Sequence, residues 1–204
     1  MNDLEARQKI REIMMQLCTD LLTQFGSMRR AALAENPRPE DDMCSVLPPD
    51  LGIINLTEEG IQVGQLKLIG GAQDSRMFEA VLREASRRHK ADATYIVCEG
   101  FTRPMTSEAE VDQYRKEREA GVNLKDASVG GEPIETVFVR LNGFGMTFMA
   151  QSTFKDDGDI DQIQFIEDGI KREGTRTESR FDNLGVDDKS LQIPEKDLPS
   201  DGFH

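Results

Sequence analysis

The alternation of apolar and polar positions is clearest over residues 134–154. Two runs rich in β-branched and aromatic residues flank Asn142-Gly143, and both of these residues accept the positive φ that a tight turn requires. The pattern predicts a β-hairpin with its turn at Asn142-Gly143. It indicates a globular protein that contains a β-sheet.

A helical pattern fills residues 3–34, where apolar side chains recur at steps of three and four and therefore share one face. Asp3 is suited to cap the start of this helix, and the prolines that follow Asn36 end it. Gly26 lies inside the pattern and permits a bend or a break there. The apolar stripe consists of Ile10, Met14, Leu17, Leu21, Phe25 and Met28.

The other elements follow from periodicity, prolines and capping signals. Ser107 and Glu110 form a capping box that opens a short charged helix. Residues 36–52 contain four prolines and predict an extended strap across the domain. The remaining predictions are a strand over 61–69, a helix from 74 or 75 to about 90, a strand over 93–101, a helix over 107–120, a turn over 155–159 and a strand over 160–166.

This order of elements predicts an α+β fold. It comprises an antiparallel sheet of four or five strands with a packed helix, a long N-terminal helix and an acidic C-terminal tail. We expect three regions: an amphipathic helix over residues 1–35, an α+β domain over 36–169, and a largely flexible tail over 170–204, where large apolar residues are sparse.

Charge changes the picture of what the protein binds. The 204 residues carry a net charge of −13, and residues 151–204 hold 14 acidic against 7 basic side chains. Phosphate backbones and anionic membranes repel such a chain, so we expect neither direct nucleic-acid binding nor membrane binding. The N-terminus lacks a signal-peptide pattern and no apolar run is long enough to cross a bilayer, which predicts a cytoplasmic protein.

Candidate metal and cofactor chemistry is sparse. Three cysteines and two histidines, without a Cys-x-x-Cys motif, predict neither a zinc site nor a disulfide framework. Asp157, Asp159 and Asp161 match the first three ligand positions of a calcium loop, but Gln162 replaces its glycine and Asp168 its terminal glutamate. We therefore expect a solvated turn, and no metal and no cofactor.

No nucleophile motif, phosphate-binding loop or dinucleotide fingerprint occurs, so no catalytic residue is assigned and the protein is expected not to be an enzyme. Glu99 is the one carboxylate of interest, because it ends an apolar strand and shares a face with Tyr95. Partial desolvation would raise its pKa unless Arg140 or Arg103 pairs with it. Glu99, Arg140 and Tyr95 thus form a candidate buried polar site. A structural ion pair is favoured over a catalytic acid, because ion-pair networks perturb carboxylates without catalysis.

The N-terminal stripe has two readings. It could pair with the same helix of a second copy, or it could cover one face of the sheet. A helix of ~45 Å is longer than a strand of about five to seven residues can shelter, which favours a homodimer.

The chain resembles a family of uncharacterised bacterial and phage proteins over two stretches, residues 91–101 and residues 132–139, which a polar segment separates. In that family a strand ending in a Ser-Glu-Ala-Trp-like motif is followed by a Pro-x-Arg-x-Glu stretch and another strand. Here Cys98-Glu99-Gly100-Phe101 stands in place of the first motif, and Pro133 and Glu135 remain of the second. The resemblance covers roughly residues 74–154. It implies a small bacterial or phage α+β protein without a known activity.

Taken together, these features predict a non-enzymatic bacterial or phage interaction protein that forms a homo-oligomer and binds an unknown protein partner. The alternative is an acidic inhibitor, of an anti-defence or anti-restriction type, that occupies the basic nucleic-acid-binding surface of another protein. Asp and Glu side chains gathered on one folded face would favour this alternative.

Overall fold

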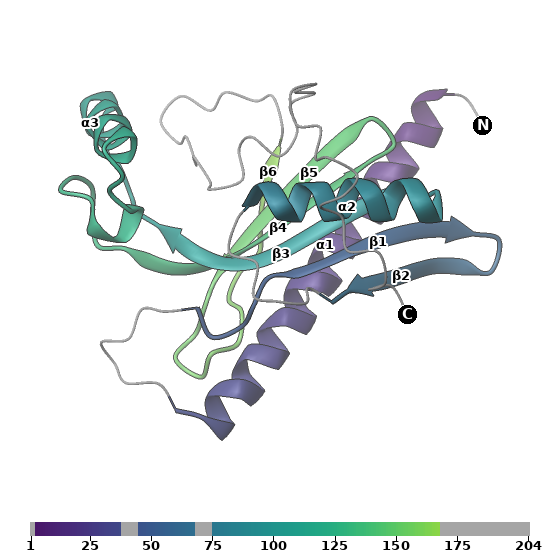
Figure 1. Cartoon of the computed structure of the whole chain (residues 1–204), viewed down its shortest axis with the longest axis horizontal. Coiled ribbons are helices and arrows are strands. Elements are labelled where there is room, and N and C mark those ends of the chain that lie inside the picture. Colours follow the sequence, from purple (N-terminus) through teal and green to yellow (C-terminus); the bar gives the residue numbers. More distant parts are fainter. Residues whose placement is uncertain (1–2, 38–44, 68–74, 168–204) are drawn as a thin grey trace, which may run out of the picture. The chain divides into compact units, whose positions relative to one another are not determined.

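The computed structural model describes residues 3–37, 45–67 and 75–167 (Figure 1). The described residues divide into two compact units, one made of residues 3–37, 45–50 and 95–167 and the other of residues 51–67 and 75–94. The α+β class predicted from the sequence is confirmed, with three α-helices and six strands in the described residues rather than four or five strands. The acidic tail predicted over 170–204 lies outside the described residues.

The first unit combines a long helix with four strands in the order β3-β4-β5-β6. Strand β5 pairs antiparallel with both β4 and β6, and helix α1 packs on β4 and β5. The predicted strand over 93–101 and the capped helix over 107–120 are both confirmed. The elements are α1 (Asp3–Glu35), β3 (Ala93–Thr102), α3 (Glu108–Glu119), a short 3-10 helix η1 (Leu124–Asp126), β4 (Ile134–Gly143), β5 (Met146–Thr153) and β6 (Gln164–Glu167).

The apolar stripe of α1 is largely buried within its own chain. Met14, Leu17, Leu21 and Phe25 are buried, and Ile10 and Met28 at the two ends are half-buried. The expectation that one sheet could not cover the stripe was therefore wrong. It assumed strands of five to seven residues, whereas β4 has 10 residues, a length of about 33 Å.

Gly26 does not break α1, because the helix continues without interruption to Glu35. A Cβ at this position would lie 2.7 Å from Cγ2 of Ile160 and 3.1 Å from its backbone nitrogen. Glycine therefore allows the segment that follows the turn at 155–159 to cross close to the helix. This turn is the predicted one, closed by hydrogen bonds from Lys155 N to Asp159 O and from Gly158 N to Lys155 O.

The strand predicted over 160–166 is shorter than expected. Ile160 forms a single bridge with Phe154, and regular pairing resumes only in β6 at Gln164.

The hairpin of β4 and β5 is confirmed, but its turn lies two residues beyond the predicted position. Asn142 and Gly143 are paired strand residues, opposite Thr147 and Met146. The turn consists of Phe144 and Gly145, with φ values of 54° and 70°. Asn142 stabilises the strand instead, because its side-chain oxygen accepts a hydrogen bond from Oγ1 of Thr147 across the pair at 2.9 Å.

The second unit contains an antiparallel hairpin and a helix: β1 (Asp50–Thr57), β2 (Gly60–Leu66) and α2 (Ser75–His89). Helix α2 matches its prediction and buries Phe78, Leu82 and Ala85. Strand β1 was not predicted, because proline and glycine are unfavourable in strands and this segment contains Pro48, Pro49 and Gly52. The chain leaving α2 is tied to β1 by hydrogen bonds from Asp92 N to Ile54 O and from Leu56 N to the Asp92 carboxylate.

Candidate functional site

The Glu99 carboxylate, on β3 in the first unit, is buried, with 6% of its side chain exposed. It accepts hydrogen bonds from the backbone nitrogens of Val46 at 2.6 Å and Leu47 at 3.3 Å. The end of the strap that precedes β1 is thereby held on β3. The carboxylate therefore satisfies the backbone N–H groups of Val46 and Leu47 and fixes the position of this segment.

Arg29 of α1 supplies the opposite charge. Its side chain is 3% exposed, its Nε lies 3.3 Å from Oε1 of Glu99, and its Nη2 lies 2.7 Å from Oε2 of Glu135 on β4. Its guanidinium also lies 3.8 Å from the centre of the Phe154 ring, a cation–π contact. One arginine therefore joins the helix to β3, β4 and the residue that follows β5. We call Arg29, Glu99, Glu135 and Phe154 the Arg29 cluster.

Arg29 was not predicted as the partner of Glu99. The available signal was its spacing: Arg29 follows Phe25 by four residues and so continues the buried face of the helix. A charged residue on such a face requires a buried partner.

The predicted partners are engaged elsewhere. Arg140 donates from Nε to the Asn142 side chain at 3.3 Å, and Tyr95 donates its hydroxyl to Asp50 at 3.5 Å. Arg103 donates to the carbonyls of residues 125, 127 and 129, and so fixes the loop before β4. Glu99 and Tyr95 do share β3, but the ion pair that forms on Glu99 is the one with Arg29.

Burial raises the pKa of Glu99 above its ordinary value, and the nearby Glu135 carboxylate acts in the same direction. The hydrogen bonds from Val46 and Leu47 and the charge of Arg29 oppose this rise in the pKa without cancelling it. The Arg29 cluster has one guanidinium for two carboxylates, so it favours a proton on Glu99 more than a matched pair would.

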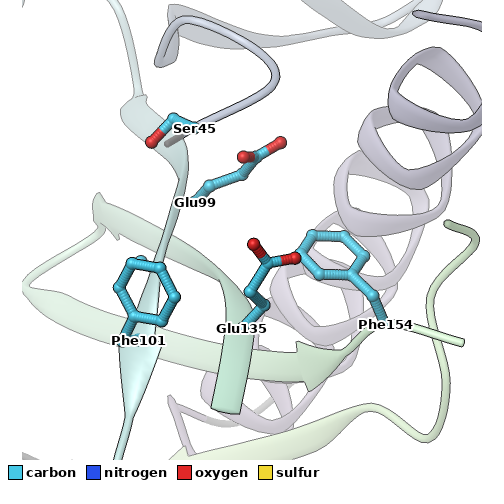
Figure 2. A pocket seen from close by; sticks show the side chains of 6 residues that line it. Ser45, Glu99, Phe101, Glu135 and Phe154 are labelled. Carbon is cyan, nitrogen blue, oxygen red and sulfur yellow. The ribbon is translucent and has the colours of Figure 1, made fainter. Parts of the chain in front are cut away.

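A small cavity of about 10 Å³ lies beside the cluster. Figure 2 shows the side chains of Glu99 and Glu135 entering the same space, with the rings of Phe101 and Phe154 around them. The backbone at Gly100 and the side chain of Ser45 complete the lining. A space of this size holds roughly one water molecule, so it offers no room for an organic substrate.

The acidic turn at 155–159 is organised by its own carboxylates. Asp157 accepts a hydrogen bond from the Asp159 nitrogen at 3.1 Å, and Asp159 pairs with Arg30 of α1 at 3.1 Å. Within residues 3–37, 45–67 and 75–167, no group of three or more His, Cys, Asp or Glu side chains is placed to hold a metal ion. Asp168, the last position of the calcium-loop comparison, lies outside this part of the chain.

Strand β2 in the second unit is a different kind of candidate, an interaction surface. Residues 60–65 are all exposed, and Ile61 and Val63 have exposed fractions of 45% and 48%. All seven residues pair with β1 without a bulge, and none is charged or proline. Among the described strands, β2 stands at the end of the strand order, with β1 as its neighbour.

Exposed edge strands normally carry charges, prolines or bulges that prevent pairing with another chain. Strand β2 carries none of these, so it is suited to accept a further strand. The sequence contained a signal that we did not use: the uncharged run from Gly60 to Leu66 is bounded by Glu58-Glu59 and by Lys67.

Comparison with known proteins adds no family: no family model matches the chain, and neither a curated protein nor a solved structure is similar to it. The resemblance of residues 74–154 to bacterial and phage proteins therefore stays a prediction. In the described residues, no helix is long and apolar enough to cross a membrane.

Proposed function

We propose that this protein is a non-enzymatic interaction protein of a bacterium or phage, and that it acts as a homo-oligomer through β2. The observation that carries the proposal is the exposed, uncharged and unbulged edge strand from Gly60 to Leu66. A strand of this kind binds by extending its sheet, with backbone hydrogen bonds for affinity and alternate side chains for specificity.

The Arg29 cluster supports a binding role over catalysis. Its carboxylates face a guanidinium and backbone amides, and the cavity beside them admits about one water molecule. Such a cluster fixes the relative positions of α1, β3 and β4. It leaves no substrate-sized space next to Glu99, whose pKa is raised by burial.

Strand β2 is also a better oligomer surface than the α1 stripe that the sequence suggested. Most of that stripe is buried in its own chain, whereas Ile61 and Val63 are about half exposed. The alternative function, an acidic inhibitor, requires a folded face of carboxylates available to a partner. Glu84 of α2 pairs with Arg87 and Arg88, and Glu117 of α3 binds Ser128, so these two carboxylates are engaged within the chain and do not support that alternative.

Sedimentation velocity at tens of micromolar protein tests the proposal. The full chain should be oligomeric, and Val63→Lys should convert it to monomer, because a lysine opposes strand addition at an edge. Ile134→Lys is the matched control: it also places a lysine at an exposed strand residue, one with an exposed fraction of 41%, and should leave the oligomer intact. A monomeric wild-type chain would remove the homo-oligomer from the proposal.

A further inference from the structure

We propose that β2 pairs antiparallel with β2 of a second copy, about a two-fold axis that passes through Val63. The inference rests on the proposed function and specifies its partner and register. A two-fold contact uses the same surface on both subunits, so the surface must be complementary to itself. Backbone geometry, apolar side chains and charge each meet this requirement at β2.

The backbone groups on the outer edge of β2 follow from its pairing with β1. Thr57 and Gly60 are the last pair before the two-residue turn at Glu58-Glu59, where the turn hydrogen bond joins the first residue to the fourth. Hydrogen-bonded pairs alternate along an antiparallel ladder. Gly60, Gln62 and Gly64 thus direct their backbone groups to β1, and Ile61 and Val63 direct theirs to the outer edge.

The length of β2 selects the register. With Val63 opposite the partner subunit's Val63, all seven residues from Gly60 to Leu66 find a partner. A shift of the two-fold axis in either direction leaves residues at both ends unpaired. In the centred register the outward backbone groups of Val63 face those of the partner subunit's Val63, as in a hydrogen-bonded pair of an antiparallel ladder.

The same register joins the exposed apolar side chains. Ile61 and Val63 are two residues apart and lie on one face of the strand. Val63 stands directly opposite the partner subunit's Val63. Ile61 is the diagonal neighbour of the partner subunit's Val63. Diagonal neighbours on one face of a sheet are close enough to interact. Two copies therefore bring Ile61 and Val63 of both strands side by side in one apolar patch of four side chains.

Charge at the two ends of β2 distinguishes this arrangement from others. Glu59 precedes the strand and Lys67 follows it, and both are exposed. In the centred antiparallel register Glu59 lies opposite the partner subunit's Lys67, and symmetry repeats the pair at the other end. A parallel arrangement would instead place glutamate beside glutamate, which is destabilising. The strand between these ends, from Gly60 to Leu66, adds no like charges to the contact, because it contains no charged residue.

Charge-swapped variants test the register. Glu59→Lys alone, and Lys67→Glu alone, each turn two attractive pairs into two repulsive ones, so each should raise the dimer dissociation constant on the order of tenfold. When the two single variants are mixed in equal amounts, both end pairs of the mixed dimer regain opposite charges. The mixture should form a heterodimer at wild-type affinity, and the Glu59→Lys, Lys67→Glu double variant should form a homodimer again.

Sedimentation equilibrium gives the dissociation constants, and mass spectrometry under native conditions identifies the mixed dimer. Circular dichroism should be the same for all variants, because both substituted residues are exposed. If Val63→Lys abolishes the wild-type dimer but the swaps have no effect, or if mixing restores nothing, this register is rejected and the proposed function survives. A wild-type chain that is monomeric rejects the second copy and the homo-oligomer together.

Discussion

The two hairpins of this protein have similar strand chemistry and opposite surroundings. In the first unit, β4 buries Val137, Val139 and Leu141, and helix α1 packs on it (Figure 1). In the second unit, β2 offers Ile61 and Val63, which have equally high strand propensity, yet residues 60–65 are all exposed. The apolar character of a strand therefore does not decide its role. What decides it is whether another element of the same chain covers it.

The packing of α1 on β4 and β5 depends on a charged contact as well as on apolar side chains. Arg29 extends the buried face of α1 and reaches both Glu99 and Glu135. Strand β2 has charges only next to its ends, at Glu59 and Lys67. In the first unit the charges join elements within one chain, whereas we propose that those next to the ends of β2 pair with a second copy.

The largest effect should come from the cluster that attaches α1. Arg29→Ala should lower the free energy of unfolding by about 4 kcal/mol, because it leaves two carboxylates without their buried counter-charge. Arg30→Ala is the neighbouring control. Its ion pair with Asp159 involves a side chain that is 51% exposed, so the loss should stay below about 1 kcal/mol. Urea unfolding followed by circular dichroism measures both, and equal losses would contradict the assigned role of Arg29.

Truncation of one apolar side chain in each hairpin compares the two strands directly. Leu141→Ala should cost about 3 kcal/mol, because Leu141 is fully buried and its loss leaves a cavity. Ile61→Ala should change the unfolding free energy by about 0.5 kcal/mol or less at a protein concentration where the chain is monomeric. A large loss for Ile61→Ala under these conditions would mean that β2 is covered within its own chain.

The pH dependence of stability should have opposite signs in the two units. The pKa of Glu99 is raised by burial, so its contribution is fully present below the ordinary pKa of 4.5 and is lost as the pH rises through the raised pKa. The pKa of Glu84 is lowered to about 2 by hydrogen bonds from Arg87 and Arg88, so its contribution is present above 4.5 and is lost as the pH falls toward 2.

Stability measured for wild type, Glu99→Gln and Glu84→Gln from pH 3 to pH 7 checks these signs. Between these limits the wild-type chain should lose stability relative to Glu99→Gln as the pH rises, by about 1.4 kcal/mol for each unit of the pKa difference. Relative to Glu84→Gln it should gain stability. A pH-independent difference for Glu99→Gln would show that this carboxylate titrates normally in the folded protein.

The smallest effect concerns the two turns. Phe144 has a φ of 54°, a conformation that is unfavourable for phenylalanine and better tolerated by asparagine. Phe144→Asn should raise the free energy of unfolding by about 0.5 to 1 kcal/mol. In the turn between β1 and β2, Glu58 has no positive φ, so Glu58→Asn should produce no such gain. Thermal unfolding of the two variants separates backbone strain from a general effect of asparagine.

The sequence predicted elements best where the signal was local. Helix α2, strand β3 and the capped start of α3 came from short-range periodicity and from one side-chain contact, Ser107 with the Glu110 nitrogen. The β4–β5 hairpin was predicted for the same reason, but its turn was displaced. Asn142-Gly143 is a strong turn signal in isolation, and pairing of β4 with β5 extends through both residues to Phe144-Gly145.

The sequence by itself thus determined the α+β class, most of the elements and the presence of a partly buried Glu99. Only the tertiary structure decided that Arg29 pairs with Glu99, that the α1 stripe is covered by β4 and β5, and that β2 is left exposed. The physical reason is one of range. Helix and strand preferences act between residues a few positions apart, whereas burial and ion pairing depend on which distant segments meet, and Arg29 and Glu99 meet across 70 positions of chain.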